Sequence, residues 1–256
     1  DRTSMNLTAR PLLFGAAAAL LVGFSKTGMP GAGIPAVAMM AEVFRENTKL
    51  SVGAILPLLI LGDLFAIVYY RRHADWRRLL ELCPYVVAGM VPAYLVLRFV
   101  DDDALRVSIG VLILVLLGLH VIRERYGFRE LSDRWWFTAT TGMLAGFATT
   151  VSNAAGPVMG IYLVGRHMDK HQFLGTSAWF FFLVNVSKIP GYAALGMLTT
   201  ESFPFVLLLM PIVGAGAVLG VRPEPFGMGG GTFAKAFNLG GIPAVGAVQF
   251  SHRLGD

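Results

Sequence analysis

An interrupted apolar run constrains this chain more than any other feature. Residues 11–44 are mostly apolar, yet residues 23–35 read Gly-Phe-Ser-Lys-Thr-Gly-Met-Pro-Gly-Ala-Gly-Ile-Pro. Proline removes a backbone donor and glycine lowers helix propensity, so the run cannot form one regular helix. Non-helical backbone at membrane depth is tolerated only where protein or a water-filled cavity surrounds it. The run therefore predicts a broken helical hairpin whose freed amides and half-helix ends hold an ion or an anionic group.

The composition indicates an integral membrane protein. The chain has 256 residues, of which 55% are hydrophobic and only 14% charged, and its mean hydropathy is +0.64. A soluble domain has about 25% charged residues. Several apolar runs approach the length that crosses a bilayer. We expect an all-α, multi-pass protein of the cell inner (cytoplasmic) membrane, with the lipid bilayer as its surroundings.

The net charge of +5 is spread over short loops. This distribution fits membrane topology better than binding to nucleic acid, so no nucleic-acid partner is expected.

The second half of the chain contains a counterpart of the first break. Residues 146–157 also begin with Gly-Phe, and Gly156 follows Gly146 at the spacing at which Gly33 follows Gly23. The chain is therefore predicted to contain two copies of one unit, each built around a broken segment.

Polar residues further along each half support this duplication. Asp63 and Asn185 follow the glycine of their own Gly-Phe pair at nearly the same spacing. Each is followed seven residues later by a tyrosine, Tyr70 or Tyr192.

We expect two inverted repeats, each a broken helical hairpin followed by about three transmembrane helices. The first repeat is residues 1–134, with a hairpin at 11–44 and helices at 51–70, 82–97 and 105–122. The second is residues 135–222, with a hairpin at 138–164 and helices at 173–195 and 203–221. The final helix of the second repeat is expected to be missing or irregular, because residues 223–256 are rich in proline and glycine. At ~1.5 Å per residue the first broken run holds two half-length helices but not two full crossings.

The distribution of basic residues favours this topology. If each hairpin returns to the side from which it entered, most basic residues lie on one side of the membrane, as in cytoplasmic loops. The inner basic segments are then 71–78, 123–134, 166–170 and Arg222. The outer segments carry Arg45, Lys49, Arg98 next to an Asp run at 101–103, and the loop 196–202, which has no basic residue.

Two lysines within apolar segments are the leading candidates for function. A charge inside a membrane segment is by default a functional hypothesis. Lys26 precedes the first break, although it could instead extend to the interface. Asn185 and Lys188 share a helix face at spacing i, i+3, with Tyr192 one turn on, and this face would line an anion site. A buried structural network is the alternative for Lys188.

Asp63 has two open interpretations, an ion-pair partner of one of the lysines or a proton carrier in coupling. Hydroxyl and amide groups gather at both breaks, where they also serve as ordinary helix-packing residues. The expected substrate-binding residues are Ser25, Lys26, Thr27, Gly28, Gly31, Gly33, Ser152, Asn153, Gly156, Asn185, Lys188 and Tyr192.

No catalytic residues, metal site or cofactor are expected. His167 and His171 have the i, i+4 spacing of metal ligands, but no third ligand lies nearby in the sequence. No nucleophile–base set appears, so the chain is not expected to be an enzyme.

The motif Gly23-Phe24-Ser25-Lys26-Thr27-Gly28, with Gly31 and Gly33, resembles the TauE/SafE family of membrane transporters. The resemblance covers residues 11–222, and Asn185 and Lys188 are similar to the pattern of that family. It implies two related four-segment halves, no bound cofactor, and transport of sulfur-containing or carboxylated small anions.

The expected function is a secondary transporter, working as an exporter, that moves small organic or sulfur-containing anions and holds them at the two broken helices. A passive anion channel or permease and a non-transport membrane assembly protein remain alternatives. Assembly into a homo-oligomer stays open.

Overall fold

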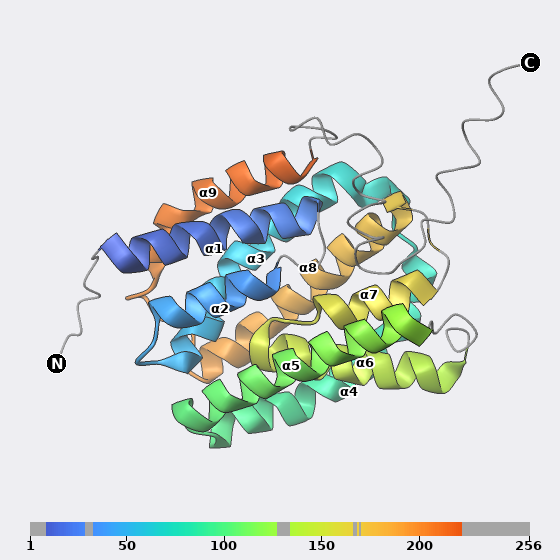
Figure 1. The fold of residues 1–256 in the computed structure, drawn as a ribbon, viewed down its shortest axis with the longest axis horizontal. Helices are drawn as coiled ribbons and strands as arrows, with labels where there is room; N and C mark the ends of the chain where they lie inside the picture. Colours follow the sequence, from blue (N-terminus) through green and yellow to red (C-terminus); the bar gives the residue numbers. More distant parts are fainter. Residues whose placement is uncertain (1–8, 29–32, 127–133, 166–167, 169, 222–256) are drawn as a thin grey trace, which may run out of the picture.

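The computed structural model describes residues 9–28, 33–126, 134–165, 168 and 170–221 (Figure 1). In this part of the chain all regular elements are helices, which confirms the predicted all-helical class. They are α1 (Ala9–Thr27), α2 (Gly33–Val43), α3 (Thr48–Tyr70), the short 3-10 helix η1 (Arg71–His73), α4 (Trp76–Phe99), α5 (Asp102–Tyr126), α6 (Trp135–Ser152), α7 (Gly156–Gly165), α8 (Lys170–Ala194) and α9 (Phe203–Val221). The tail at 223–256, predicted to be irregular, lies outside the described residues.

Four of the described helices are long and apolar enough to cross a membrane: α1, α3 together with η1, α4 and α9. At ~1.5 Å per residue the 24 residues of α4 span about 36 Å, which exceeds a hydrocarbon core of about 30 Å. A stripe of large apolar side chains along α4 is more than half exposed: Leu80, Val87, Val91, Leu95 and Phe99. Such a stripe is unfavourable in water and suits contact with lipid.

Side-chain caps fix where several helices begin. The Asn47 side chain accepts a hydrogen bond from the Leu50 amide at 2.9 Å and starts α3. Asp75 caps α4 in the same way. Asp101 accepts from the Ala104 amide at 2.8 Å at the start of α5. Such caps satisfy amides that the first helical turn leaves without partners.

The first broken segment consists of two arms of unequal length. α1 has 19 residues and ends at Thr27, and the chain then reverses so that α2, with 11 residues, runs back along it (Figure 1). The expectation of two half-length helices is wrong for the first arm, because α1 alone is long enough to cross a membrane. Its Leu- and Ala-rich sequence offsets the low helix propensity of Gly15 and Gly23, so the helix continues until the glycines and prolines that follow Thr27.

The second broken segment has the same asymmetry. α6 has 18 residues and α7 has 10. α6 ends because Asn153 adopts the left-handed conformation, with φ 56°, which asparagine tolerates better than most residues. The chain then re-enters a helix at Gly156.

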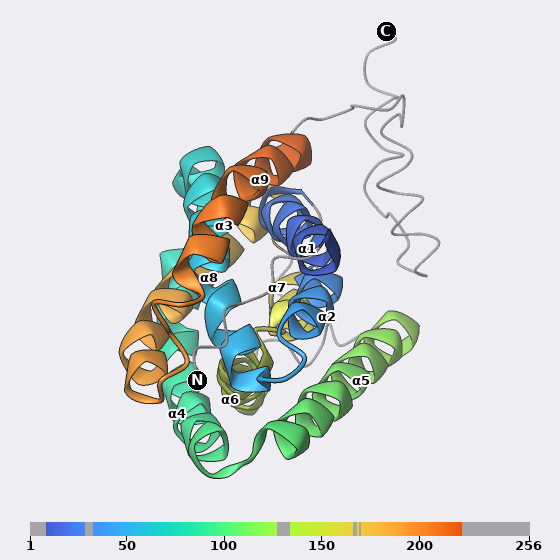
Figure 2. The same cartoon turned by 90° about the vertical axis from the view of Figure 1, so that its left-hand side faces the viewer.

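The core falls into two groups of helices with matching members. One cluster joins α1, α2, α3 and α9, and another joins α4, α6, α7 and α8 with one residue of α5. Figure 2 shows α1, α2 and α9 on one side of the molecule and α4 and α6 on the other. A third cluster lies where the two groups meet, and it contains Tyr192.

Glycines bring the long helices into backbone contact in a reciprocal way. A Cβ on Gly23 of α1 would overlap the Val213 carbonyl of α9, and one on Gly146 of α6 would overlap the Val86 carbonyl of α4. The glycine of each Gly-Phe motif therefore makes the same kind of close contact: Gly23 brings α1 against α9, and Gly146 brings α6 against α4. Close backbone approach of this kind stabilises helix packing in lipid, where no hydrophobic effect draws helices together.

The α3 and α8 helices pack against each other in opposite directions. A Cβ on Gly53, near the start of α3, would overlap the carbonyl of Met197, just beyond the end of α8. One on Gly175, near the start of α8, would lie 2.6 Å from the carbonyl of Tyr70, at the end of α3. This antiparallel pair carries Asp63, Asn185 and Lys188 in the middle of the molecule.

Candidate functional site

Lys26 and Asp63 form an ion pair between α1 and α3. Lys26 Nζ lies 2.8 Å from Asp63 Oδ1, and the side chains are 12% and 0% exposed. The ammonium group also lies over the Phe181 ring of α8, 4.1 Å from its centroid. Lys26 therefore points into the protein rather than extending to the interface, and of the two lysines it is the one that pairs with Asp63.

The second oxygen of Asp63 is bound by α8. Asn185 Nδ2 donates to Asp63 Oδ2 at 2.7 Å, and both residues are buried. Because both carboxylate oxygens have partners, the acid is held in one orientation between α1 and α8.

Lys188 is fully buried, and its described contacts are all to neutral groups. Its Nζ donates to Asn153 Oδ1 at 2.6 Å and to the carbonyl and hydroxyl oxygens of Thr149 at 3.1 and 3.2 Å. These three acceptors match the three donors of an ammonium group. Among the residues that the structure describes, no carboxylate lies within ion-pair distance of Lys188.

Asn153 joins the second break to two other helices. Its Oδ1 accepts from Lys188 of α8, and its Nδ2 donates to the Val52 carbonyl of α3 at 3.0 Å. The residue that ends α6 thus also binds the buried lysine, together with Thr149.

The hydroxyl groups at the breaks donate to helix carbonyls. Ser25 donates to the Val22 carbonyl at 2.9 Å, and Ser152 donates to the Ala148 carbonyl at 2.9 Å. Thr27 reaches across to α9, where it donates to a carbonyl at 2.7 Å. In the described structure these groups hold the ends of the helices and keep only acceptor capacity for another partner.

Two tyrosines make equivalent hydrogen bonds to the two breaks. Tyr192 donates to the Thr150 carbonyl at 2.7 Å, and Tyr70 donates to the Thr27 carbonyl at 3.0 Å. Tyr192 is fully buried, so its hydroxyl supports the end of α6 rather than facing an open space.

The glycines expected at the site occupy different positions. A Cβ on Gly28 would lie 2.8 Å from the Gly220 backbone of α9, so this position permits close packing at the end of α1. Gly33 begins α2 beside Ser25, and Gly156 begins α7. Gly31 lies outside the described residues.

Two residues at the centre are absent from the expected binding set: Thr149 and Phe181. Thr149 binds Lys188 through two oxygens, and Phe181 lies against Lys26. A signal for Thr149 is present in the sequence, because it follows Gly146 at the spacing at which Lys26 follows Gly23. Nothing in the sequence distinguishes Phe181 from the neighbouring phenylalanines.

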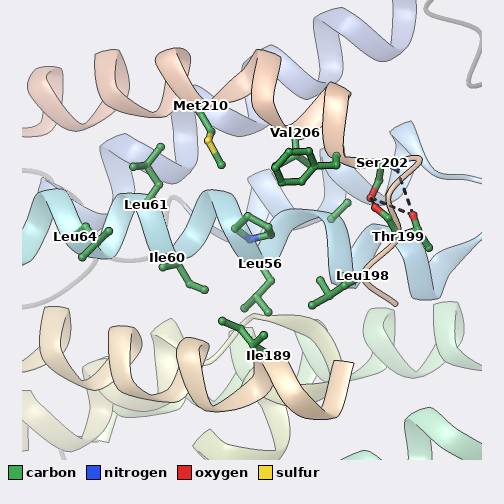
Figure 3. Close-up of a pocket in the computed structure, with 14 residues that line it drawn as sticks. Leu56, Ile60, Leu61, Leu64, Ile189, Leu198, Thr199, Ser202, Val206 and Met210 are labelled. Atoms are coloured by element: carbon green, nitrogen blue, oxygen red, sulfur yellow. Dashed lines mark hydrogen bonds between the residues drawn. The ribbon is translucent and has the colours of Figure 1, made fainter. Parts of the chain in front are cut away.

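An apolar groove with a volume of about 420 Å³ lies between α3, α8, α9 and the chain that joins α8 to α9 (Figure 3). Its polar members include Thr199 and Ser202, whose hydroxyls hydrogen-bond at 3.2 Å. No charged residue lines it. The groove therefore lacks the cation that an anion site requires.

The described part of the chain contains no group of three side chains that could hold a metal ion. The His171 ring lies against His73, with centroids 5.2 Å apart, whereas His167 lies outside the described residues.

The helices long enough to cross a membrane and the buried polar centre between them define an all-helical, multi-pass membrane protein. The family model described as "Sulfite exporter TauE/SafE" matches residues 13–223, and the chain belongs to this family. The resemblance read from the Gly-Phe-Ser-Lys motif is thereby confirmed, and the class of function is that of an exporter-type membrane transporter. Comparisons with curated proteins and with solved structures gave no match.

Proposed function

We propose that this protein is a secondary transporter that exports a small organic or sulfur-containing anion and holds it between the two broken helices, close to Lys188 and Lys26. The observation that carries the proposal is the environment of Lys188, a fully buried ammonium group with only neutral described partners. A buried charge is unfavourable unless an opposite charge compensates it. An anionic substrate supplies that compensation.

The breaks add a second attraction for an anion. α2 begins at Gly33 and α7 begins at Gly156, and the amino end of a helix carries partial positive charge and free amides. Asn153, just before α7, already contacts Lys188. In the proposal, Asn153 Oδ1 leaves Lys188 when the anion arrives, and a donor of the ammonium group turns to the anion.

The proposal includes two inverted repeats, residues 1–134 and 135–222, related by a pseudo-twofold axis between α3 and α8. The reciprocal glycine contacts, the two tyrosine hydrogen bonds and the matching helix clusters support this relation. The antiparallel packing of α3 and α8 supports inversion, because equivalent helices then run in opposite directions through the membrane. The partner of α5 in the second repeat would fall beyond α9, outside the described residues.

Transport by this arrangement requires movement of one repeat against the other. Lys188 and Asp63 are closed off from solvent in the described structure, so an anion reaches them only when helices separate on one side. The basic segments 71–78 and 123–134 would face the cytoplasm of a cell whose inner membrane holds the protein.

Uptake of a labelled sulfonate into proteoliposomes tests the proposal. We expect Lys188→Ala to abolish uptake, while Lys49→Ala, which removes the same type of charge at the start of α3, retains it. Both variants should be expressed and purified at the level of the parent protein. Unchanged uptake by Lys188→Ala would remove Lys188 from the site.

Counterflow distinguishes a carrier from a channel. If the protein is a carrier, proteoliposomes loaded with unlabelled anion accumulate labelled anion against its concentration gradient. The initial rate of this uptake saturates as the outside concentration rises. A passive channel does neither, so linear, non-accumulating flux would favour the permease alternative.

A further inference from the structure

The interior where α1, α3, α6 and α8 meet contains three acidic or basic side chains of the described chain. Asp63 and Lys188 are the fully buried charged residues, and the Lys26 side chain is 12% exposed. Since little solvent screens these groups, their summed charge decides which ligand leaves the interior neutral.

Two of the three charges cancel each other. Lys26 contacts Asp63 at 2.8 Å, and the other carboxylate oxygen accepts from the neutral amide of Asn185 at 2.7 Å. Among the described residues, Asp63 pairs with Lys26 and does not lie within ion-pair distance of Lys188.

When protonated, Lys188 therefore contributes one positive charge that no described group pairs with. Its three acceptors, one from Asn153 and two from Thr149, satisfy its hydrogen bonds but carry no formal charge. Hydrogen bonds to neutral groups lower the free energy of a buried ion without cancelling its long-range field.

We infer that the site, which rests on the anion transport proposed above, selects anions with a single negative charge. A singly charged anion brings the interior to neutrality. A dianion leaves one uncompensated negative charge in a medium of low dielectric constant, and a neutral solute leaves the positive charge of Lys188 unchanged.

Two sulfur oxyanions of similar shape provide the probes: methanesulfonate, with one charge, and sulfate, with two. We would measure binding of each to the purified full-length chain by calorimetry, because binding does not depend on turnover. The parent protein should bind methanesulfonate about tenfold or more tightly than sulfate.

Charge substitutions then test the count of charges. Asp63→Asn raises the net charge of the interior by one, so the ratio of the two affinities should shift about tenfold or more toward sulfate. The double variant Lys26→Met with Asp63→Asn removes both members of the pair and restores a single positive charge. Its preference should return to methanesulfonate.

Glu42→Gln is the matched control. It removes one partly exposed carboxylate that pairs with Arg10 and Arg45 and has no described ion pair with Lys26 or Lys188. The affinity ratio should remain that of the parent protein.

Each outcome bears on one of the two proposals. If the parent protein binds neither anion, both the proposed function and this inference fail. If it binds both anions but prefers sulfate, or if the double variant loses the preference for methanesulfonate, an anion site remains and the inference from charge is wrong. The double variant removes both Lys26 and Asp63, so neither is left as a buried charge without its partner. The test therefore stands even if Asp63→Asn alone does not fold.

Discussion

Asp63 of α3 and Asn185 of α8 contact each other directly, with Asn185 Nδ2 2.7 Å from Asp63 Oδ2. The two residues hold matching positions in the two halves of the sequence, and they meet where the antiparallel helices cross. Their contact ties the Lys26–Asp63 pair to the helix that carries Lys188. Any movement that separates α3 from α8 must break this hydrogen bond.

Replacing Asn185 tests this contact. Asn185→Leu keeps a similar volume but leaves Asp63 Oδ2 buried without its donor, and we expect the free energy of unfolding to fall by about 2 kcal/mol. Ser187→Ala is the control, because Ser187 donates to a carbonyl within its own helix. Thermal unfolding in detergent measures both variants, and equal stability for Asn185→Leu would show that the contact contributes nothing.

Asn153 allows its backbone and side-chain roles to be separated. Asn153→Gly keeps the left-handed backbone accessible but removes the contacts to Lys188 and to the Val52 carbonyl. Asn153→Ala loses the same contacts and adds about 1 kcal/mol of backbone strain. We expect both variants to lose anion uptake in proteoliposomes and the alanine variant to be the less stable. Normal uptake by Asn153→Gly would reduce Asn153 to a helix cap.

The two tyrosines make matching hydrogen bonds that differ in burial. Tyr192→Phe leaves the Thr150 carbonyl without a donor in a fully buried place, and the loss of stability should be about 2 kcal/mol. Tyr70→Phe should cost about 1 kcal/mol or less, because water can reach the partly exposed Tyr70 position. Unfolding curves of the two variants give the comparison, and the reverse order would contradict it.

Gly146 tests the close packing of α6 on α4. Gly146→Ala places a methyl group against the Val86 carbonyl, so we expect a loss of about 1–3 kcal/mol as the helices move apart. Gly110→Ala in α5 is the control, because no atom lies within 4 Å of the added methyl group. That substitution should be neutral or stabilising by up to about 1 kcal/mol. Equal effects of the two changes would argue against glycine-mediated contact.

The sequence determined the helical class through the apolar runs and the position of the first break through glycine and proline. The second break begins at Asn153, whose left-handed backbone ends α6. The sequence did not determine the lengths of the hairpin arms. α1 continues from Ala9 to Thr27 because most of its residues are good helix formers, although Gly15 and Gly23 lie within it. The length of the whole apolar run does not show how the break divides that run into two arms. α3 begins at Thr48, before its apolar run, because of the Asn47 cap.

The charged residues of the site were visible in the sequence because lysine and aspartate stand out in apolar segments. Which lysine pairs with Asp63 depends on how α1, α3 and α8 pack, and no local pattern encodes that choice. Thr149 was one of several hydroxyl residues noted at the breaks, and Phe181 one of several neighbouring phenylalanines, so the sequence did not single out either. Only the tertiary contacts separate them from residues that merely pack.

The central claim is that the substrate anion lies beside the buried ammonium group of Lys188. Bromomethanesulfonate carries an anomalous scatterer on a singly charged sulfonate, and a crystal structure of the protein with this anion would locate it. We predict a sulfonate oxygen about 3 Å from Lys188 Nζ, in place of the Asn153 contact, and no bound bromine in the Lys188→Met variant. Bromine found only among the basic loops, with Lys188 still bound to Asn153 and Thr149, would contradict the account.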